Sequence, residues 1–328
     1  MPGRIVLLHT SPRLPAGLLT ARAWELVRSA PVFAGADSPQ AAALAATGAS
    51  VTVLPGTPGE QAAALLAAED PTVLWLAAAD GDQRLAQALS ERLVGMASSP
   101  VLEAEYGSWD PPGARLLDAV AVMDRLRTQC PWDAEQTHAT LAPYLLEEAY
   151  EAHDAIASGD VAHLREELGD VLFQVVFHAR VGADGDPAFD IDDVAAGLVE
   201  KLVRRHPHVF ADVTVSGSEE VHANWERIKQ AEKGRASALD GVPRDQPALA
   251  LAAKFQSRAE RAGVTVDLPV PAGADAEVAS DTPDAELGAT LFALVARARA
   301  AGLDPEAALR RATLRYGDAV RAAEQNLG

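Results

Sequence analysis

The chain has 328 residues, with 47 Asp or Glu against 28 Lys or Arg, and its formal net charge is −19 at pH 7. This excess of negative charge argues against a nucleic-acid partner, because nucleic-acid phosphates are bound by clustered positive charge. The one cysteine, Cys130, excludes an internal disulfide, and no apolar run is long enough to span a bilayer. These features favour a cytoplasmic protein of two or three domains with no membrane partner.

Residues 1–108 have the pattern of a small α/β accessory domain, because apolar strands alternate with helices. The predicted strands are 4–8, 51–54 and 72–76, and the predicted helices are 18–29 and 83–93. Residues 18–27 resemble the opening of a tetrapyrrole methylase domain. The region is too short for that complete two-part enzyme, and residues 11–15 stand where its glycine-rich loop belongs. Because of this length and the missing loop, we interpret the region as a remnant of such a domain or as an unrelated accessory domain.

A helical region follows a proline-rich boundary at 106–113. Apolar residues recur at a helical period through 114–128. The Cys-Pro-Trp-Asp segment at 130–133 is expected to form a loop, and Pro143 to begin the next helix, because proline is tolerated in a first turn. The sequence Ser-Gly-Asp at 158–160 is expected to end that helix and reverse the chain.

Two acidic motifs lie on the helices on either side of this turn. Glu148 and Glu151 are three residues apart, as are Glu167 and Asp170, so each pair lies on one face of its helix. A single acidic pair is usually solvated surface, but two pairs facing each other across an antiparallel turn repel unless a cation neutralises them. Oxygen-only ligands predict Mg²⁺, with Mn²⁺ as a substitute, rather than Zn²⁺.

The second of these helices has separate polar and apolar stripes. Glu167, Asp170, Gln174 and His178 form a polar stripe between apolar neighbours, which favours a lined cleft over a solvated surface. His178 is interpreted as a hydrogen-bonded core histidine rather than a metal ligand. The apolar residues expected to face the core are Leu164, Leu168, Val171, Leu172, Phe173, Val175, Val176 and Phe177.

A third helix is predicted over 190–205, with basic residues gathered near its end. Such residues are ordinarily solvated, but in so acidic a chain Lys201, Arg204 and Arg205 favour contacts with phosphate. The residues expected on the inner side of this helix are Val194, Leu198 and Leu202.

A fourth helix is predicted over 219–232, where Ser216 and Glu219 have the spacing of a capping box. Trp225 and Lys229 share one face of this helix. Two interpretations stay open for them: contact with a nucleotide, or a tryptophan packed in the core beside a solvated lysine.

The C-terminal part, residues 236–328, is predicted to be helical. A helix around 247–262 is followed by a stretch rich in Pro, Ala and acidic residues at 268–283, which is expected to be a flexible linker. Two more helices are expected at 284–301 and 305–325.

The ordered motifs of the central region resemble MazG-type nucleoside triphosphate pyrophosphohydrolases over about residues 113–235. The matching blocks are Cys130 to Asp133, Glu135 to Thr137, Leu145 to Glu151, Glu167 to Gln174, Arg204 to Phe210, and Trp225 with Lys229. The resemblance implies a catalytic all-α helical bundle that assembles as a homodimer or homotetramer, with its site near the interface. Residues 286–292 mirror part of the second acidic motif, but Ala289 replaces the aspartate, which implies a degenerate second unit.

The resemblance also implies a reaction, in which Mg²⁺ assists hydrolysis of a (deoxy)nucleoside triphosphate to the monophosphate and pyrophosphate. The metal ligands would be Glu148, Glu151, Glu167 and Asp170, and the general base Glu147 or Glu166. The residues expected to contact phosphate or nucleotide are Lys201, Arg204, Arg205, Trp225, Lys229 and Trp132. For Trp132, anchoring of its own loop is an equally good interpretation.

Two other classes of function stay open. The chain could be a nucleotide sensor without catalysis, given its degenerate C-terminal unit. It could also be a di-iron carboxylate protein, which needs Glu-x-x-His on each of two helices. Glu135 with His138, and Glu219 with His222, have that spacing, but neither pair belongs to the acidic motifs.

Overall fold

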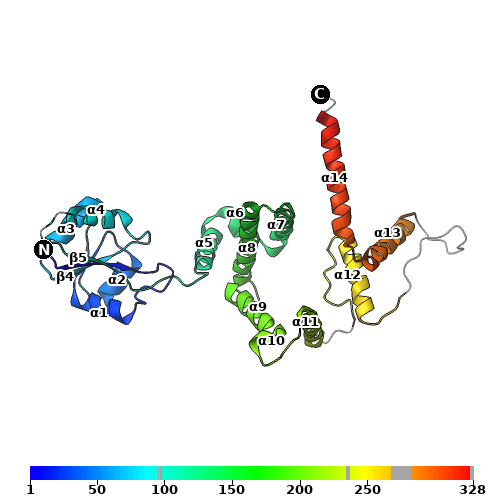
Figure 1. The fold of residues 1–328 in the computed structure, drawn as a ribbon, viewed down its shortest axis with the longest axis horizontal. Helices are drawn as coiled ribbons and strands as arrows, with labels where there is room; N and C mark the ends of the chain where they lie inside the picture. The colour runs from blue at the N-terminus through cyan, green and yellow to red at the C-terminus, as the bar shows by residue number, and fades with distance from the viewer. Residues whose placement is uncertain (95, 97, 234–236, 267–282, 326–328) are drawn as a thin grey trace, which may run out of the picture. The chain divides into compact units, whose positions relative to one another are not determined.

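The structure is a computed structural model in which the described residues are 1–94, 96, 98–233, 237–266 and 283–325. The chain divides into two compact units, Met1–Leu198 and Val199–Gly328. A small parallel sheet precedes a long series of helices, which confirms a mainly α protein with an N-terminal α/β part (Figure 1). Apart from Pro283, the linker predicted at 268–283 lies outside the described residues.

The N-terminal sheet has five parallel strands in the order β3-β2-β4-β1-β5. The strands are β1 (Arg4–His9), β2 (Val32–Ala34), β3 (Val51–Val53), β4 (Thr72–Leu76) and β5 (Val101–Tyr106). The helices between them are α1 (Ala21–Ser29), α2 (Pro39–Ala46), α3 (Pro58–Ala67) and α4 (Gln83–Leu93). The three predicted strands and two predicted helices are present, whereas β2, β5, α2 and α3 are additions to the prediction.

Helices cover both faces of this sheet (Figure 1). Alternate residues of a strand point to opposite faces, so Val6 and Leu8 of β1 pack with α1 and α2, while Ile5 and Leu7 pack with α3 and α4. Trp75 of β4 is fully buried on the second face. The region therefore has a closed core on each side of the sheet.

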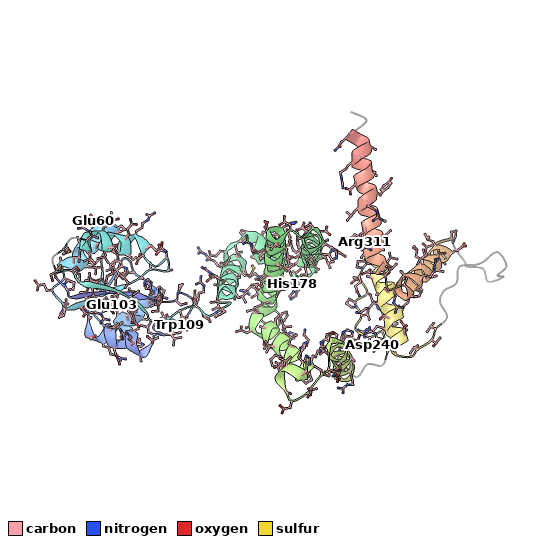
Figure 2. All side chains as sticks on the ribbon, in the orientation of Figure 1. Glu60, Glu103, Trp109, His178, Asp240 and Arg311 are labelled. Carbon is pink, nitrogen blue, oxygen red and sulfur yellow. The ribbon has the colours of Figure 1, made fainter. Side chains whose placement is uncertain are left out.

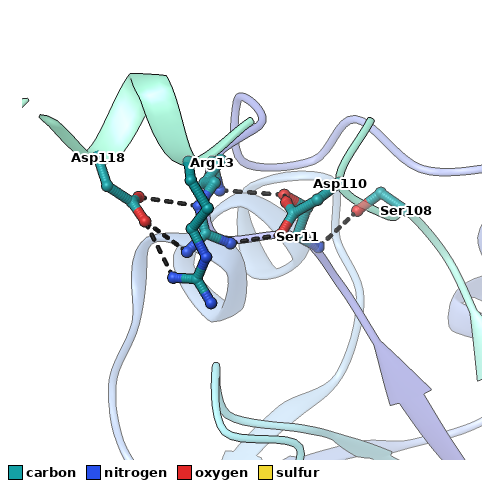
Figure 3. Close-up of polar contacts among 6 residues, drawn as sticks. Ser11, Arg13, Ser108, Asp110 and Asp118 are labelled. Atoms are coloured by element: carbon teal, nitrogen blue, oxygen red, sulfur yellow. Dashed lines mark hydrogen bonds and ion pairs between the residues drawn. The ribbon is translucent and has the colours of Figure 1, made fainter. Parts of the chain in front are cut away.

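A polar network connects the loop after β1 to the first helix of the bundle, α5 (Arg115–Gln129) (Figure 3). The hydroxyl of Ser108 accepts a hydrogen bond from the backbone N–H of Ser11 at 2.9 Å. The Arg13 guanidinium forms ion pairs with Asp110 and Asp118, and its Nε donates to Asp118 Oδ1 at 2.9 Å. The Arg13 side chain is 11% exposed, so these ion pairs are partly shielded from water.

The remaining helices of the first unit form a bundle around a small core. They are α6 (Pro131–Glu135), α7 (His138–Ser158), α8 (Val161–Ala183) and α9 (Ile191–Arg205), the last of which crosses into the second unit. Met123 of α5, Leu141 of α7, and Val176, Phe177 and Val181 of α8 are buried together. This core fixes α5 and α7 against α8.

Two predictions about the start of α7 are wrong. Residues 131–135 form the short helix α6 rather than a loop, and α7 begins at His138 rather than at Pro143. Thr137 is the N-cap of α7, and it forms a reciprocal capping box with Thr140, which satisfies backbone N–H groups at the helix start. Pro143 therefore lies inside the helix.

The turn between α7 and α8 is confirmed. Gly159 ends α7 with φ of +74°, a conformation that glycine adopts without strain, and Asp160 caps α8 by accepting from the backbone N–H groups of Ala162 and His163. The direct reversal of the chain sets α7 and α8 side by side and antiparallel.

The burial expected along α8 is only partly observed. Val176 and Phe177 are buried as predicted, but Leu168 is 53% exposed. Phe173 and Val175 are each 37% exposed. The two polar residues Glu167 and Gln174 are buried instead, since their stripe is directed towards α7.

The second unit contains the end of α9 and further helices, namely α10 (Pro207–Phe210), α11 (Ser218–Lys233), α12 (Ala248–Arg261), α13 (Pro283–Ala300) and α14 (Pro305–Gln325). The helices predicted from 219 onwards are confirmed to within a few residues. The capping partner predicted for Ser216 is wrong, because its hydroxyl and backbone N–H contact Glu220 rather than Glu219. Among the described residues no helix is both long enough and apolar enough to cross a membrane.

The inner side predicted for α9 is not buried within the chain. The residues expected to face a core are all exposed, namely Val194, Leu198 and Leu202. No described element of the same chain covers this apolar stripe.

Candidate active site

The acidic site is built by the antiparallel pair α7 and α8. Glu148 and Glu151 lie one turn apart on α7, and Glu167 and Asp170 lie one turn apart on α8. The short turn at Gly159 fixes which turns of the two helices lie opposite each other. The acidic turns therefore meet, as the sequence predicts.

Three carboxylates converge at this point. Glu148, Glu151 and Glu167 each place a carboxylate oxygen within 4.8 Å of the other two. Glu167 is 7% exposed, Glu148 is partly buried and Glu151 is exposed. The cluster is thus closed on the α8 side and open at Glu151, a geometry in which a cation can enter from solvent.

Asp170 acts on the same cluster through its charge. Burial raises the pKa of Glu148, and the negative charge of Asp170 is the largest electrostatic contribution to this rise, followed by those of Glu151, Glu147 and Glu167. Asp170 does not belong to the group of three oxygens that lie within 4.8 Å of one another. The predicted four-carboxylate set therefore consists of three close oxygens and a nearby fourth charge.

The two residues predicted as general base, Glu147 and Glu166, are both exposed, and each precedes a predicted metal ligand in the sequence. Glu147 contributes to the raised pKa of Glu148, so it lies close to the cluster. Their roles stay predictions.

His163 is a contact of the site that the sequence reasoning missed. Its Nε2 lies 2.8 Å from Oε1 of Glu167, one helical turn along α8, while Glu167 Oε2 is buried and has no hydrogen-bond partner among the described protein groups. One oxygen of Glu167 thus contacts the histidine, and the other has no partner among the described protein groups. The i,i+4 spacing of His163 and Glu167 is the signal that could have identified this pair.

The polar stripe of α8 continues beyond the acids. Gln174 is buried with an unpartnered Oε1, and His178 Nδ1 lies 2.9 Å from Nδ1 of His138, the first residue of α7. The ring of His138 also stacks on Phe189. His178, labelled in Figure 2, is thus hydrogen-bonded, as predicted, but its partner His138 was not anticipated.

Trp132 lies on α6 and is half exposed. Its ring contacts Tyr144 edge-on, with centroids 6.2 Å apart, and is tilted against the buried ring of Phe177 at the same distance. Tyr144 precedes Glu148 by one turn of α7. This position fits both interpretations of Trp132, as an anchor of its own segment and as a contact for a nucleobase. One side of the indole packs against Tyr144 and Phe177, and the other side is exposed.

The second unit brings together three of the predicted nucleotide-binding residues. The Lys229 ammonium lies 4.5 Å from the centroid of the Trp225 ring, and the Arg205 guanidinium lies 5.4 Å from it. His222 stacks on the same ring with centroids 6.4 Å apart. The shared face of Trp225 and Lys229 is confirmed. The two other predicted basic residues, Lys201 and Arg204, are exposed on α9.

The fold and the site define a helical protein with a cluster of carboxylates suited to a hard divalent cation. The profile of the MazG nucleotide pyrophosphohydrolase domain matches residues 136–210, which include both acidic motifs. The chain belongs to the MazG nucleotide pyrophosphohydrolase family, and it is an enzyme of that family.

Relatives support this assignment over a larger part of the chain. A nucleoside triphosphate pyrophosphohydrolase of Escherichia coli strain K12 is 43% identical over 226 residues, which are 63% of this chain and 86% of the relative. A protein of the same name from Mycolicibacterium smegmatis is 44% identical over 238 residues, 69% of this chain and 66% of the relative. A 26.1 kDa protein from the blaB 3′ region of Streptomyces cacaoi is 51% identical over 253 residues, 76% of this chain and 99% of the relative.

Proposed function

We propose that the chain hydrolyses (deoxy)nucleoside triphosphates to nucleoside monophosphate and pyrophosphate in a reaction that depends on Mg²⁺. The observation that carries this proposal is the convergence of Glu148, Glu151 and Glu167 from two helices onto one point. Carboxylate oxygens are the ligands that Mg²⁺ prefers, and Mn²⁺ accepts the same set. The names of the relatives support the reaction.

The three glutamates would hold the cation, and Asp170 would add its charge or a further oxygen. When bound, the cation supplies positive charge to the phosphates and lowers the pKa of a coordinated water. Glu147 or Glu166 would accept a proton from the attacking water while the oxygen of that water forms a bond to phosphorus. The bond to the pyrophosphate oxygen breaks in the same displacement, and pyrophosphate leaves.

Basic side chains of α9 and α11 would bind the triphosphate and stabilise the leaving group. Arginine suits this task because its fork of N–H groups matches phosphate oxygens. The residues proposed for it are Lys201, Arg204, Arg205 and Lys229. Trp225, with cations against its ring, and the half-exposed Trp132 would contact the base. Stacking on an aromatic ring discriminates weakly among bases, so we propose a broad base preference and a role in clearing the nucleotide pool in the cytoplasm.

We also propose that the functional form is a homodimer or homotetramer. The observation behind this proposal is the exposed apolar stripe of α9, at Val194, Leu198 and Leu202. Exposed apolar surface of this kind marks a site of association in soluble proteins. The acidic site would then lie near a subunit interface.

The two alternative classes receive less support. Glu135 lies on α6 and His138 on α7, so this Glu-x-x-His pair is divided between two helices, unlike the ligand pairs of di-iron bundles. A nucleotide sensor would bind the triphosphate without hydrolysing it, whereas the names of the relatives favour hydrolysis.

The test is release of pyrophosphate from a panel of ribo- and deoxynucleoside triphosphates with Mg²⁺, comparing wild type with Glu151→Ala. We expect the variant to lose about 100-fold or more in rate, since a ligand contributes at least as much as an outer-shell partner. Glu135→Ala is the matched control, because Glu135 is also exposed but is not one of the proposed metal ligands or general bases. Equal rates for wild type and Glu151→Ala would refute the site, and a wild type that binds triphosphate without hydrolysis would establish the sensor.

A further inference from the structure

Two glutamine side chains are buried in the described part of the chain, and they differ in their hydrogen bonds. In the second unit, Gln256 Nε2 donates to the carbonyl of Phe292 at 3.0 Å, and its Oε1 accepts from Arg299 at 3.4 Å. Gln174 on α8 is 2% exposed, yet its Oε1 has no partner among the described groups. A buried amide oxygen without a partner lowers stability. Gln256 thus has an evident structural role, whereas Gln174 does not.

The position of Gln174 on α8 points to the acidic site. It follows Asp170 by four residues and Glu167 by seven, so all three lie on the same side of the helix. Side chains on an α-helix lean towards its N-terminus and cover the turn before their own Cα atom. This tendency would place the amide of Gln174 over the turn that carries Asp170.

Unpartnered buried atoms follow this side of α8 from the acidic site onwards. They are Glu167 Oε2, Gln174 Oε1 and His178 Nε2. The other ring nitrogen of His178, Nδ1, contacts Nδ1 of His138. A row of polar atoms without protein partners is expected where water or a ligand completes the hydrogen bonds, and this row begins at the proposed metal ligands.

We propose that Gln174 is a positioning residue of the acidic site, whose amide orients the Asp170 carboxylate and the water molecules around a cation held by Glu148, Glu151 and Glu167. The inference rests on the proposed function. Mg²⁺ keeps several waters in its shell, and those waters need acceptors. Hydrogen-bond partners in the outer shell typically affect metal affinity by 10- to 100-fold. A glutamine amide serves both tasks, because its NH₂ group donates to a carboxylate and its oxygen accepts from water.

The test compares Gln174→Met with Gln256→Met in the full-length protein. Methionine is close to glutamine in shape and flexibility and removes only the polar groups. Two quantities are measured: the Kd for Mn²⁺ by titration calorimetry, and the Tm in EDTA. We expect Gln174→Met to weaken Mn²⁺ binding about tenfold and to keep or raise the Tm, because it removes an unpartnered polar group. Gln256→Met should show the reverse pattern, with a lower Tm and an unchanged Kd.

A purely structural role for Gln174 would appear as a lower Tm with a Kd within about twofold of wild type, and would overturn the inference. If Gln174→Met does not fold, Gln174→Asn keeps the amide but withdraws it by one methylene; weaker binding at an unchanged Tm supports the proposal, and an unchanged Kd overturns it. Failure of the proposed function is recognised separately, because the wild-type protein itself would then bind no Mn²⁺ and release no pyrophosphate.

Discussion

Glu148 on α7 and Glu167 on α8 hold carboxylate oxygens within 4.8 Å of each other, and an oxygen of Glu151 lies within the same limit of both. Burial and the surrounding negative charges raise the pKa of Glu148. A carboxyl group whose pKa is raised by folding binds its proton more tightly in the folded chain than in the unfolded chain. Lowering the pH towards the raised pKa of Glu148 therefore stabilises the metal-free protein against unfolding. At higher pH the carboxylates are all charged and repel one another.

We expect Glu148→Gln to raise the Tm of the metal-free protein at pH 7, because the substitution removes one of the repelling charges. The gain should shrink as the pH is lowered and Glu148 of the wild type becomes protonated. Mg²⁺ should raise the Tm of the wild type more than that of the variant. Thermal unfolding measured in EDTA and in Mg²⁺, from pH 7 downwards, tests all three effects. Glu135→Gln, a change at an exposed glutamate outside the cluster, is the control. A lower Tm for Glu148→Gln in EDTA would show that the charge is compensated within the chain.

The acidic site could be predicted because it depends on local rules. The three-residue spacing of Glu148 and Glu151 fixes a shared helix face whatever the rest of the chain does. The tight turn at Gly159 then determines which face of α8 lies opposite. The contact between His138 and His178 depends on where α7 begins, and the capping box at Thr137 determines that position. The prediction that α7 begins at Pro143 therefore could not include this contact.

Burial along α8 and α9 could not be predicted from periodicity. A helical stripe of apolar residues shows that a face can be covered, but not whether the cover belongs to the same chain. Leu168 and Leu198 lie on such stripes and are exposed in the single chain. The short strands β2 and β5 were missed for a related reason: β2 has only three residues, and β5 lies at the edge of the sheet and alternates with charged residues, as at Glu103.

The network around Arg13 predicts a second dependence on pH, of opposite sign. Hydrogen bonds lower the pKa of both carboxyl groups, with the Ser11 hydroxyl as the main cause for Asp110 and the Arg13 guanidinium for Asp118. A carboxyl group with a lowered pKa stabilises the fold above its ordinary pKa, and this contribution is lost as the pH falls through the lowered value. We expect Arg13→Ala to lower the Tm by a few degrees at neutral pH and to differ less from wild type in acid.

The matched control for Arg13→Ala is Arg22→Ala. Arg22 also pairs with an acidic residue, Glu105, but its side chain is 66% exposed, and exposed ion pairs contribute little to stability. The Tm of Arg22→Ala should stay close to that of the wild type at every pH. Equal losses in the two variants would show that the shielding of Arg13 has no energetic consequence.

The environment of Trp225 predicts an effect on substrate affinity. Lys229 and Arg205 lie against its ring, so removal of the ring loses a stacking surface and its contacts with two cations. Base stacking is worth about 1–3 kcal/mol, and we expect Trp225→Leu to raise KM about tenfold with a smaller effect on kcat. Trp24→Leu is the matched control, since Arg28 lies 5.4 Å from that ring in the sheet region. A lower stability with an unchanged KM for Trp225→Leu would favour a core role for this tryptophan.

The exposed stripe of α9 predicts the state of assembly. Leu198 is 47% exposed at the centre of this stripe, and a charge at a buried apolar contact between subunits is strongly unfavourable. We expect light scattering with size-exclusion chromatography to give a dimer or tetramer for the wild type, and Leu198→Lys to shift it towards monomer. Leu18→Lys, a change at a similarly exposed leucine of the N-terminal region, should keep the wild-type mass.

Because the acidic site is proposed to lie near the interface, pyrophosphate release should fall together with the mass of Leu198→Lys. A monomeric wild type with full activity would show that the stripe has another use and that one chain carries the complete site.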